Sequence, residues 1–358
     1  MEILLNPGPV NLSERVRQAL LRPDLCHREI EFTKLQTGIR HKLLDVYNLS
    51  EDEWTAVLIT GSGTSAMEAM LISLVPEKGG LLIIENGVYG ERLRRIADIY
   101  HIAHQTLHYD WGQEIQAGDV ETLLSGEITH VALVHHETTT GRLNNPAQIA
   151  ELCKTAGIPM LLDGVSSFGA EAMDFFDWNL QACAATANKC LHGIPGTSFV
   201  ICRRDALQAT AGLQRSLYLD LHTYALQQDA GGTPFTQSVQ SFYALDEALT
   251  EHQEQGGWTA RRELYRSRMA RVRQGFESLG IRALLPADEC SCVLNSFYLP
   301  EDLDFQTLHD GLKQRGFVIY AGQGGLVQSI FRVSLMGTIS TSDIQQFLTA
   351  VEEVISGK

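Results

Sequence analysis

The chain has 358 residues, of which 44% are hydrophobic and 20% charged, with 31 glycines and 10 prolines. This composition excludes disordered and collagen-like chains, and the length suggests two domains. Because 43 acidic and 28 basic side chains give a formal net charge of −15, binding of nucleic acid through a broad basic face is also excluded.

No membrane span is predicted, since apolar runs such as residues 158–162 are far shorter than the roughly 18 residues that cross a bilayer. The seven cysteines are scattered and show neither a disulfide framework nor a paired metal-binding spacing. The start of the chain has no basic segment followed by a long apolar one. We therefore expect a cytoplasmic protein without a bound metal.

Short apolar runs alternate with helical patterns in the first two thirds of the chain. After an N-terminal arm at residues 1–15, this alternation predicts an α/β fold whose mainly parallel sheet is covered by helices on both faces. We expect this large domain to span residues 16–245. The predicted strands lie at 54–60, 81–84, 130–134, 160–162 and 198–202, and the predicted helices near 65–73, 92–100 and 146–156.

The pattern changes after Leu191: the expected strand at 198–202 is followed by polar loops up to Pro234 and then by a long helical stretch from about 237 to 279. The remainder predicts a smaller α+β domain at residues 246–358. Its expected strands are 292–294, 317–320 and 330–333, and its expected helices are 303–315 and 341–355.

A glycine-rich turn, Gly61-Ser-Gly-Thr-Ser-Ala66, stands between a predicted strand and a predicted helix. Glycines let the backbone approach a ligand, and the unpaired N–H groups of a helix start favour a phosphate. The same residues fit a nicotinamide-binding turn, with Glu85 at the end of the next strand as the ribose-binding acid. A purely structural turn is the third possibility.

Two further residues distinguish these possibilities. Asp163 ends a predicted parallel strand, where open α/β sheets bind their ligands, although it could simply cap the next segment. Lys189 follows the apolar segment 182–186. A lone lysine is usually a surface group, but an apolar setting lowers the pKa of the amine and suits it to form a Schiff base.

A phosphate cradle, a strand-end carboxylate and a lysine on the following segment together meet the requirements of pyridoxal phosphate. The carboxylate keeps the ring nitrogen protonated, and the lysine holds the aldehyde. A nicotinamide enzyme needs neither group, so the combination favours pyridoxal phosphate as the cofactor.

Several tracts resemble, in order, the motifs of class V aminotransferases of fold type I. The resemblance extends from Asn6-Pro-Gly-Pro9 nearly to the C-terminus and implies a pyridoxal phosphate-dependent transaminase that forms a homodimer with a shared active site. The tracts are Gly61-Ser-Gly-Thr64, Asn86-Gly-Val-Tyr-Gly90, Glu137-Thr-Thr-Thr-Gly141, Asp163-Gly-Val-Ser-Ser167, Ala187-Asn-Lys189 and Phe331-Arg-Val-Ser-Leu-Met-Gly337.

The resemblance also implies roles for individual residues. Asp163 would bind the ring nitrogen, and Lys189 would carry the cofactor and move the proton during transamination. Thr236 would reach the phosphate of the neighbouring subunit. The other implied cofactor-binding residues are Ser62, Gly63 and Thr64 at the phosphate, Tyr89 and Val165 on the two ring faces, Thr138 at the phenolic oxygen, and Asn188.

Arg332 lies in a predicted strand, where the ordinary explanation is a salt bridge or an outward-facing side chain. By resemblance it instead binds the carboxylate or phosphonate of the substrate. Arg28 either adds a second cation or braces the N-terminal arm. The resemblance further implies a ping-pong transfer of an amino group from 2-aminoethylphosphonate to pyruvate, with alanine or serine and glyoxylate or pyruvate as the alternative substrates.

Three other functions remain open from the sequence. A desulfurase or lyase would need a reactive thiol, for which Cys290 and Cys292 are candidates, although core packing is the simpler explanation for Cys292. A nicotinamide-dependent dehydrogenase follows if the glycine-rich turn and Glu85 bind a dinucleotide. A non-catalytic protein could have kept the pocket.

Overall fold

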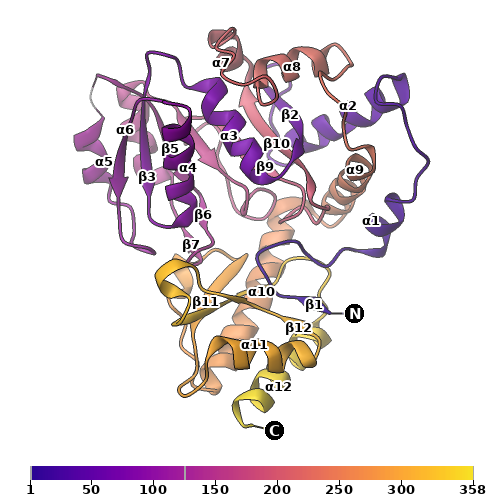
Figure 1. The fold of residues 1–358 in the computed structure, drawn as a ribbon, viewed down its shortest axis with the longest axis vertical. Helices are drawn as coiled ribbons and strands as arrows, with labels where there is room; N and C mark the ends of the chain where they lie inside the picture. Colours follow the sequence, from indigo (N-terminus) through magenta and orange to yellow (C-terminus); the bar gives the residue numbers. More distant parts are fainter. Residues whose placement is uncertain (1, 125, 358) are drawn as a thin grey trace.

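The computed structural model describes residues 2–124 and 126–357. They form a large part built on one central sheet and a smaller part that contains the C-terminal third of the chain (Figure 1). None of the helices in the described ranges combines the length and the apolar character that crossing a bilayer requires.

The central sheet of the described chain has seven strands, and it is mainly parallel as predicted. Strand β10 is antiparallel to both of its neighbours, β2 and β9, whereas all the other pairs are parallel. The order is β2 (Trp54–Gly61), β10 (Gly196–Arg203), β9 (Leu180–Thr186), β8 (Met160–Asp163), β5 (Ile128–Val134), β3 (Gly80–Glu85) and β4 (His104–His108).

Helices cover both faces of this sheet, which explains why its inner strands are apolar along their whole length. One face packs against α2 (Ile30–Asp45), α5 (Ala117–Leu123), α6 (Ala147–Ala156) and α9 (Val239–Glu254). The other face packs against α3 (Gly63–Leu74), α4 (Val88–Ile99), α7 (Arg204–Ala209) and α8 (Leu221–Asp229).

The prediction of polar loops up to Pro234 is wrong, because α7 and α8 lie in that stretch. Both are short, at six and nine residues. Helix α8 buries a polar residue, Gln228, whose side chain bonds both the N–H and the carbonyl of Leu58 at 3.1 and 2.7 Å. An inward-facing glutamine interrupts the apolar stripe by which a helix is identified in a sequence.

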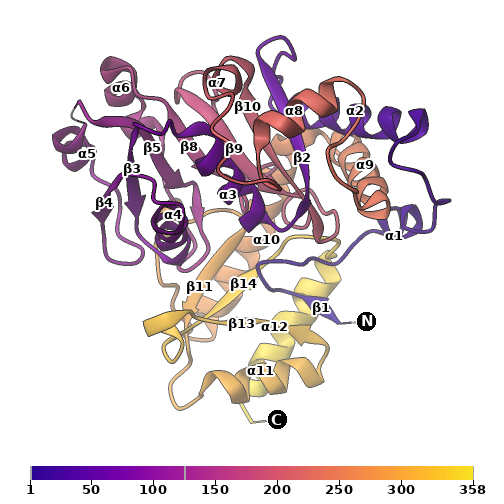
Figure 2. The same cartoon turned by 45° about the horizontal axis from the view of Figure 1, so that its top comes forward.

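The smaller part contains an antiparallel sheet of order β11-β14-β13, formed by Leu294–Tyr298, Ile330–Ser334 and Tyr320–Ala321. Figure 2 shows these strands together with the helices of this part. The helices are α10 (Gly257–Ser278), α11 (Phe305–Gln314) and α12 (Thr341–Ile355). The expected strand at 292–294 begins only at Leu294, and the expected strand at 317–320 is divided into β12 (Phe317–Val318) and β13.

The N-terminal arm joins the smaller part. Strand β1 (Ile3–Leu4) pairs in parallel with β12 (Phe317–Val318), and the arm then runs on to α1 (Glu14–Ala19). The boundary predicted near residue 245 falls inside α9, which packs against α1 and α2. The long helical stretch is instead broken at Gly256, whose φ of 96° ends α9 before α10 packs against α12.

Candidate active site

The residues that the sequence singles out lie where neighbouring strands end. Asp163 is the last residue of β8, and Lys189 follows β9 in the turn at residues 187–190. Strand β5 leads into β6 (His136–Glu137), which pairs with β7 (Arg142–Leu143). Because β5, β8 and β9 are parallel, their carboxyl ends lie at one edge of the sheet, where open α/β sheets bind ligands.

Asp163 presents one unsatisfied carboxylate oxygen in this site. Its Oδ1 accepts a hydrogen bond of 2.9 Å from the Val165 N–H, whereas the buried Oδ2 has no partner among the described residues. Burial raises the pKa of Asp163 to about 6, and the charges of Arg92 and Lys189 oppose this shift. A protonated ring nitrogen is the kind of donor that Oδ2 lacks.

Thr138 provides a second unsatisfied oxygen. Its Oγ1 is buried and has no hydrogen-bond partner within the part of the chain that the structure describes. A hydroxyl can both donate and accept a hydrogen bond, so it suits a phenolic oxygen. The two residues that the resemblance assigns to the ring nitrogen and the phenolic oxygen of pyridoxal phosphate, Asp163 and Thr138, thus each have a buried oxygen without a partner in the described residues.

Lys189 is held in an apolar setting. Burial lowers the pKa of its amine, and the charge of Arg332 acts in the same direction, whereas Tyr89 and Asp163 oppose the shift. The N-terminal arm forms one wall of this setting: a Cβ on Gly8, whose φ is +112°, would lie 2.9 Å from Lys189 Cδ. A lowered pKa leaves more of the amine unprotonated and able to attack an aldehyde.

The glycine-rich turn begins α3, with Ser62 as the extended N-cap residue. The first N–H groups of a helix have no intrahelical partner and favour an anion. Gly63 has no room for a side chain, since a Cβ there would lie 2.7 Å from Val165 Cγ1. The absence of a side chain at Gly63 therefore lets the turn lie directly against Val165. Asn188, also expected here, accepts a hydrogen bond of 2.8 Å from Thr186 Oγ1.

Glu137 is a buried carboxylate near the expected site whose structural role the sequence did not reveal. Its buried Oε2 accepts hydrogen bonds from the N–H groups of Tyr89 and Gly90, at 3.2 and 3.3 Å. Burial raises the pKa of Glu137 to about 7, although its hydrogen bonds with Thr139 and Gly90 oppose the shift. Glu137 therefore fixes the start of α4 and, with it, the position of Tyr89.

Arg332 faces inward from β14, as the resemblance implies, and is buried. Its Nε donates to the Ala321 carbonyl at 2.8 Å, and Nη1 donates to the Thr138 carbonyl at 3.0 Å and to Gln323 Oε1 at 3.2 Å. No carboxylate forms an ion pair with it in residues 2–124 and 126–357. A buried guanidinium held only by neutral acceptors is suited to receive an anion.

Two expected site residues are not brought to Lys189 within this chain. Arg28 is exposed in the turn before α2, and Thr236 is exposed in the segment between α8 and α9. Their predicted roles, a second substrate cation and a phosphate contact in a neighbouring subunit, stay predictions.

The residues that a dehydrogenase, a desulfurase or a lyase would use are not available for that chemistry. Glu85 is buried and pairs with Arg94 and His108, at 3.1 and 2.9 Å, so it does not present a free carboxylate to a ribose. Burial raises the pKa of the Cys290 and Cys292 thiols, which lowers their reactivity. Cys292 packs in an apolar cluster, as core packing predicts.

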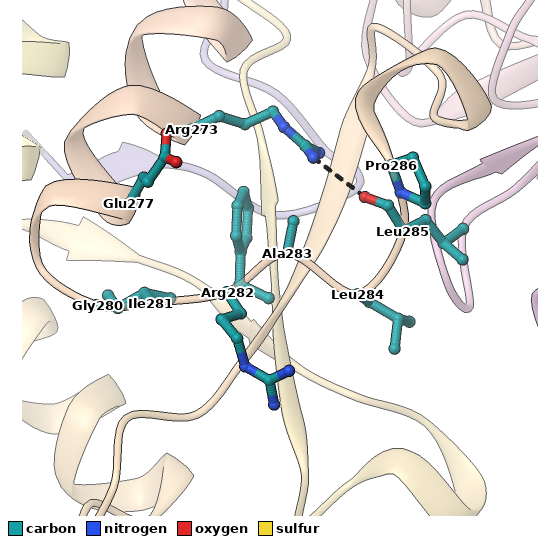
Figure 3. A pocket seen from close by; sticks show the side chains of 10 residues that line it. Arg273, Glu277, Gly280, Ile281, Arg282, Ala283, Leu284, Leu285 and Pro286 are labelled. Carbon is teal, nitrogen blue, oxygen red and sulfur yellow. Dashed lines mark hydrogen bonds between the residues drawn. The ribbon is translucent and has the colours of Figure 1, made fainter.

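A separate cavity of about 490 Å³ lies in the smaller part (Figure 3). It contains none of the residues expected to bind a cofactor. Arg273 on its wall donates hydrogen bonds to the Leu285 carbonyl at 3.1 Å and to Asn295 Oδ1 at 2.6 Å. The cavity therefore lacks the lysine and the orphaned carboxylate oxygen that define the site at the sheet edge.

Comparison with known proteins identifies relatives along the whole chain. The family profile described as aminotransferase class-V matches residues 14–347. The chain is 36% identical to the 2-aminoethylphosphonate–pyruvate transaminase of Vibrio vulnificus, an alignment that covers 99% of this chain and 97% of the relative. It is 35% identical to the transaminase of the same name from Bacillus cytotoxicus, over 98% of this chain and 97% of the relative.

Solved structures share the fold. A Thermus thermophilus aspartate aminotransferase of subgroup IV superposes with a TM-score of 0.91 at 28% identity, covering 99% of each chain. The alanine–glyoxylate aminotransferase of a Nostoc species gives a TM-score of 0.90 at 25% identity, over 99% of this chain and 95% of that one. The matches confirm the expected fold and exclude the dehydrogenase alternative: this chain belongs to the class-V aminotransferases, with pyridoxal phosphate as the cofactor.

Proposed function

We propose that this aminotransferase moves the amino group of 2-aminoethylphosphonate to pyruvate, which gives phosphonoacetaldehyde and alanine. The observation that carries the proposal is the identity of 35–36% to transaminases named for these two substrates, over nearly the full length of both chains. The inward-facing Arg332, which no carboxylate neutralises in the described residues, supports a substrate with an anionic end.

The proposed roles follow from the contacts around Lys189. When bound, pyridoxal phosphate supplies an aldehyde that condenses with amines and a ring that withdraws electrons from the substrate carbon. Asp163 Oδ2 holds the proton of the ring nitrogen, and Thr138 Oγ1 bonds the phenolic oxygen. Lys189 Nζ moves the proton at the substrate carbon, and its lowered pKa suits an amine that must act as a base.

Arg332 is the proposed binding group for the anionic end of both substrates. Its planar fork fits a phosphonate and a carboxylate alike. The two half-reactions of a ping-pong transfer use the site in turn, so one cation can bind the phosphonate of the donor and then the carboxylate of pyruvate. Gln323 and the Ala321 carbonyl keep the guanidinium in one orientation.

We also propose a cytoplasmic homodimer in which Thr236 reaches the phosphate site of the partner. Support for the dimer comes from the exposed Thr236 and from Leu217 and Tyr218 nearby in sequence, which are 85% and 39% exposed. All seven cysteines are free thiols, which supports a reducing compartment.

The test is to incubate the purified protein and pyruvate with 2-aminoethylphosphonate, serine or no donor, and to quantify alanine and the aldehyde product by chromatography. We expect equal amounts of alanine and phosphonoacetaldehyde from 2-aminoethylphosphonate, and none from the Lys189→Ala variant. In a parallel assay, the protein is incubated with alanine and glyoxylate, and the formation of glycine and pyruvate is measured. Faster turnover of serine with pyruvate, or of alanine with glyoxylate, would overturn the phosphonate assignment.

A further inference from the structure

Arg92 is a cation of α4 that none of the expected site roles uses. Its Nη1 donates a hydrogen bond of 3.3 Å to Thr64 Oγ1, on the first turn of α3. Its guanidinium carbon lies 4.5 Å from the centroid of the Tyr89 ring. Residues 89 and 92 are one helical turn apart, so both side chains lie on the face of α4 that packs toward α3.

The neighbouring arginines of α4 are accounted for differently. Arg94 pairs with Glu85 and Asp98, at 3.1 and 3.5 Å, and Arg95 is exposed. Arg92 is half-buried, yet no ion pair joins it to a carboxylate anywhere in residues 2–124 and 126–357. A partly buried guanidinium that forms no ion pair with a carboxylate favours a bound anion.

The position of Arg92 indicates which anion that is. Thr64 belongs to the helix start that presents unpaired N–H groups to a phosphate, and the Arg92 guanidinium touches that residue. Its charge also reaches into the site, since it lowers the pKa of Asp163 against the effect of burial. Arg332 lies instead at the Thr138 carbonyl, which gives the substrate anion a cation of its own.

We propose that Arg92 binds the phosphate of pyridoxal phosphate together with the turn Ser62-Gly-Thr64, and that the same guanidinium steadies the Tyr89 ring from the face opposite the cofactor. The inference rests on the cofactor of the family and does not depend on which amine is the donor. A dianionic phosphoryl group is the shared chemistry of the cofactor and of a phosphonate substrate, and the proposal commits to the cofactor.

Pyridoxal, which lacks the phosphate, provides the test. Cofactor-free wild type, Arg92→Ala, Arg92→Gln and Arg92→Lys are titrated with pyridoxal phosphate and with pyridoxal, and dissociation constants are measured by fluorescence without substrate. Loss of a charge-assisted contact should weaken pyridoxal phosphate binding by about 10- to 100-fold in the Ala and Gln variants. Pyridoxal affinity should change less than about 3-fold, and Lys should restore part of the loss.

Arg95→Ala, which removes an exposed arginine from the same helix, is the matched control and should bind both compounds as the wild type does. Circular dichroism of each variant checks its folding. Inorganic phosphate should raise the melting temperature of the cofactor-free wild type more than that of Arg92→Gln.

Equal weakening for pyridoxal phosphate and pyridoxal would overturn the phosphate role, since Arg92 would then act through Tyr89 alone. Unchanged cofactor binding with a raised KM for 2-aminoethylphosphonate would also overturn it, by assigning Arg92 to the substrate. If the wild type does not use 2-aminoethylphosphonate but the two cofactor titrations differ as expected, the proposed donor fails and the role of Arg92 stands.

Discussion

The main-chain carbonyl of Thr138 accepts a hydrogen bond of 3.0 Å from Nη1 of Arg332, a residue 194 positions later in the chain. The contact joins the large part, which holds the residues proposed to bind the cofactor, to the smaller part, which supplies the cation proposed to bind the substrate. The Thr138 hydroxyl has no hydrogen-bond partner among the described residues, which leaves it available for the proposed bond to the cofactor. Under the proposed roles, Thr138 contacts the substrate-binding arginine through its carbonyl and the cofactor through its hydroxyl.

Replacing Lys189 by alanine should abolish transamination, because no other amine described here is placed to hold the aldehyde and move the proton. The cofactor should still bind noncovalently, since the other contacts remain. Borohydride reduction followed by peptide mass analysis should label Lys189 in the wild type and no lysine in the variant. Retained turnover would refute the assignment of Lys189.

Asp163→Asn should slow the reaction severely, because a neutral amide cannot keep the ring nitrogen protonated. The variant should still bind the cofactor, so absorbance of the bound cofactor is measured alongside kcat. Rates near those of the wild type would contradict the role of Asp163 Oδ2.

The same substitution predicts a pH effect on the stability of the cofactor-free protein. Burial raises the pKa of Asp163 to about 6 from the ordinary value of 3.8, so the folded state binds more protons than the unfolded state between these values. Stability from this group is therefore lost as the pH rises from 4 through 6, by about 3 kcal/mol. The free energy of unfolding of the wild type and of Asp163→Asn is measured with urea at pH 4 and pH 8. The wild type should lose about 3 kcal/mol more than the variant between these pH values. A difference between the two proteins that does not change with pH would contradict the prediction.

Arg332→Ala should weaken transition-state binding of the anionic substrates by about 2 to 4 kcal/mol, about 30- to 1000-fold in kcat/KM. Arg332→Lys should recover only part, because an ammonium cannot form the planar fork. Both donor and acceptor kinetics are needed, since the proposal places one cation in both half-reactions. Unchanged kcat/KM for both substrates would remove Arg332 from the site.

Gly63→Ala should weaken cofactor binding, because its Cβ would lie 2.7 Å from Val165 Cγ1. Valine is stiff at χ1 and cannot easily turn the methyl group away. Adding Val165→Ala to Gly63→Ala should restore part of the affinity by removing the clashing methyl. Titration of the two single variants and the double variant with pyridoxal phosphate measures this coupling, and independent effects would show that the contact does not position Val165.

Much of the fold was predictable because most strands of the central sheet are apolar runs separated by clear turns, the polar edge strand β4 being an exception. The expected strand at 130–134 and helix at 146–156 appear as β5 and α6, and the helix at 341–355 appears as α12. Helix α2 was not predicted. It buries Gln36 and Arg40, which bond the Gly232 and Ala56 carbonyls, and such inward-facing polar residues hide the apolar stripe.

Some residues of the candidate site could also be predicted from the sequence, and others could not. Asp163 and Lys189 were identifiable because each follows an apolar strand and departs from its surroundings in charge. Glu137 was not, because its role depends on the first turn of α4, which lies far away in the sequence and donates the Tyr89 N–H to its carboxylate. Thr236 and Arg28 could be connected to the site only through a resemblance, and a single chain leaves both exposed.

The parallel pairing of β1 with β12 has a consequence for biosynthesis. Synthesis runs from the N-terminus, so the ribosome releases β1 long before the strand with which it pairs. Until residues 317–318 emerge, the segment containing Gly8 has no anchor in the smaller part, and the flank of Lys189 that it covers stays open to water. A nascent chain truncated before β12 would thus have every residue of the glycine-rich turn and still lack the anchored N-terminal arm that covers Lys189.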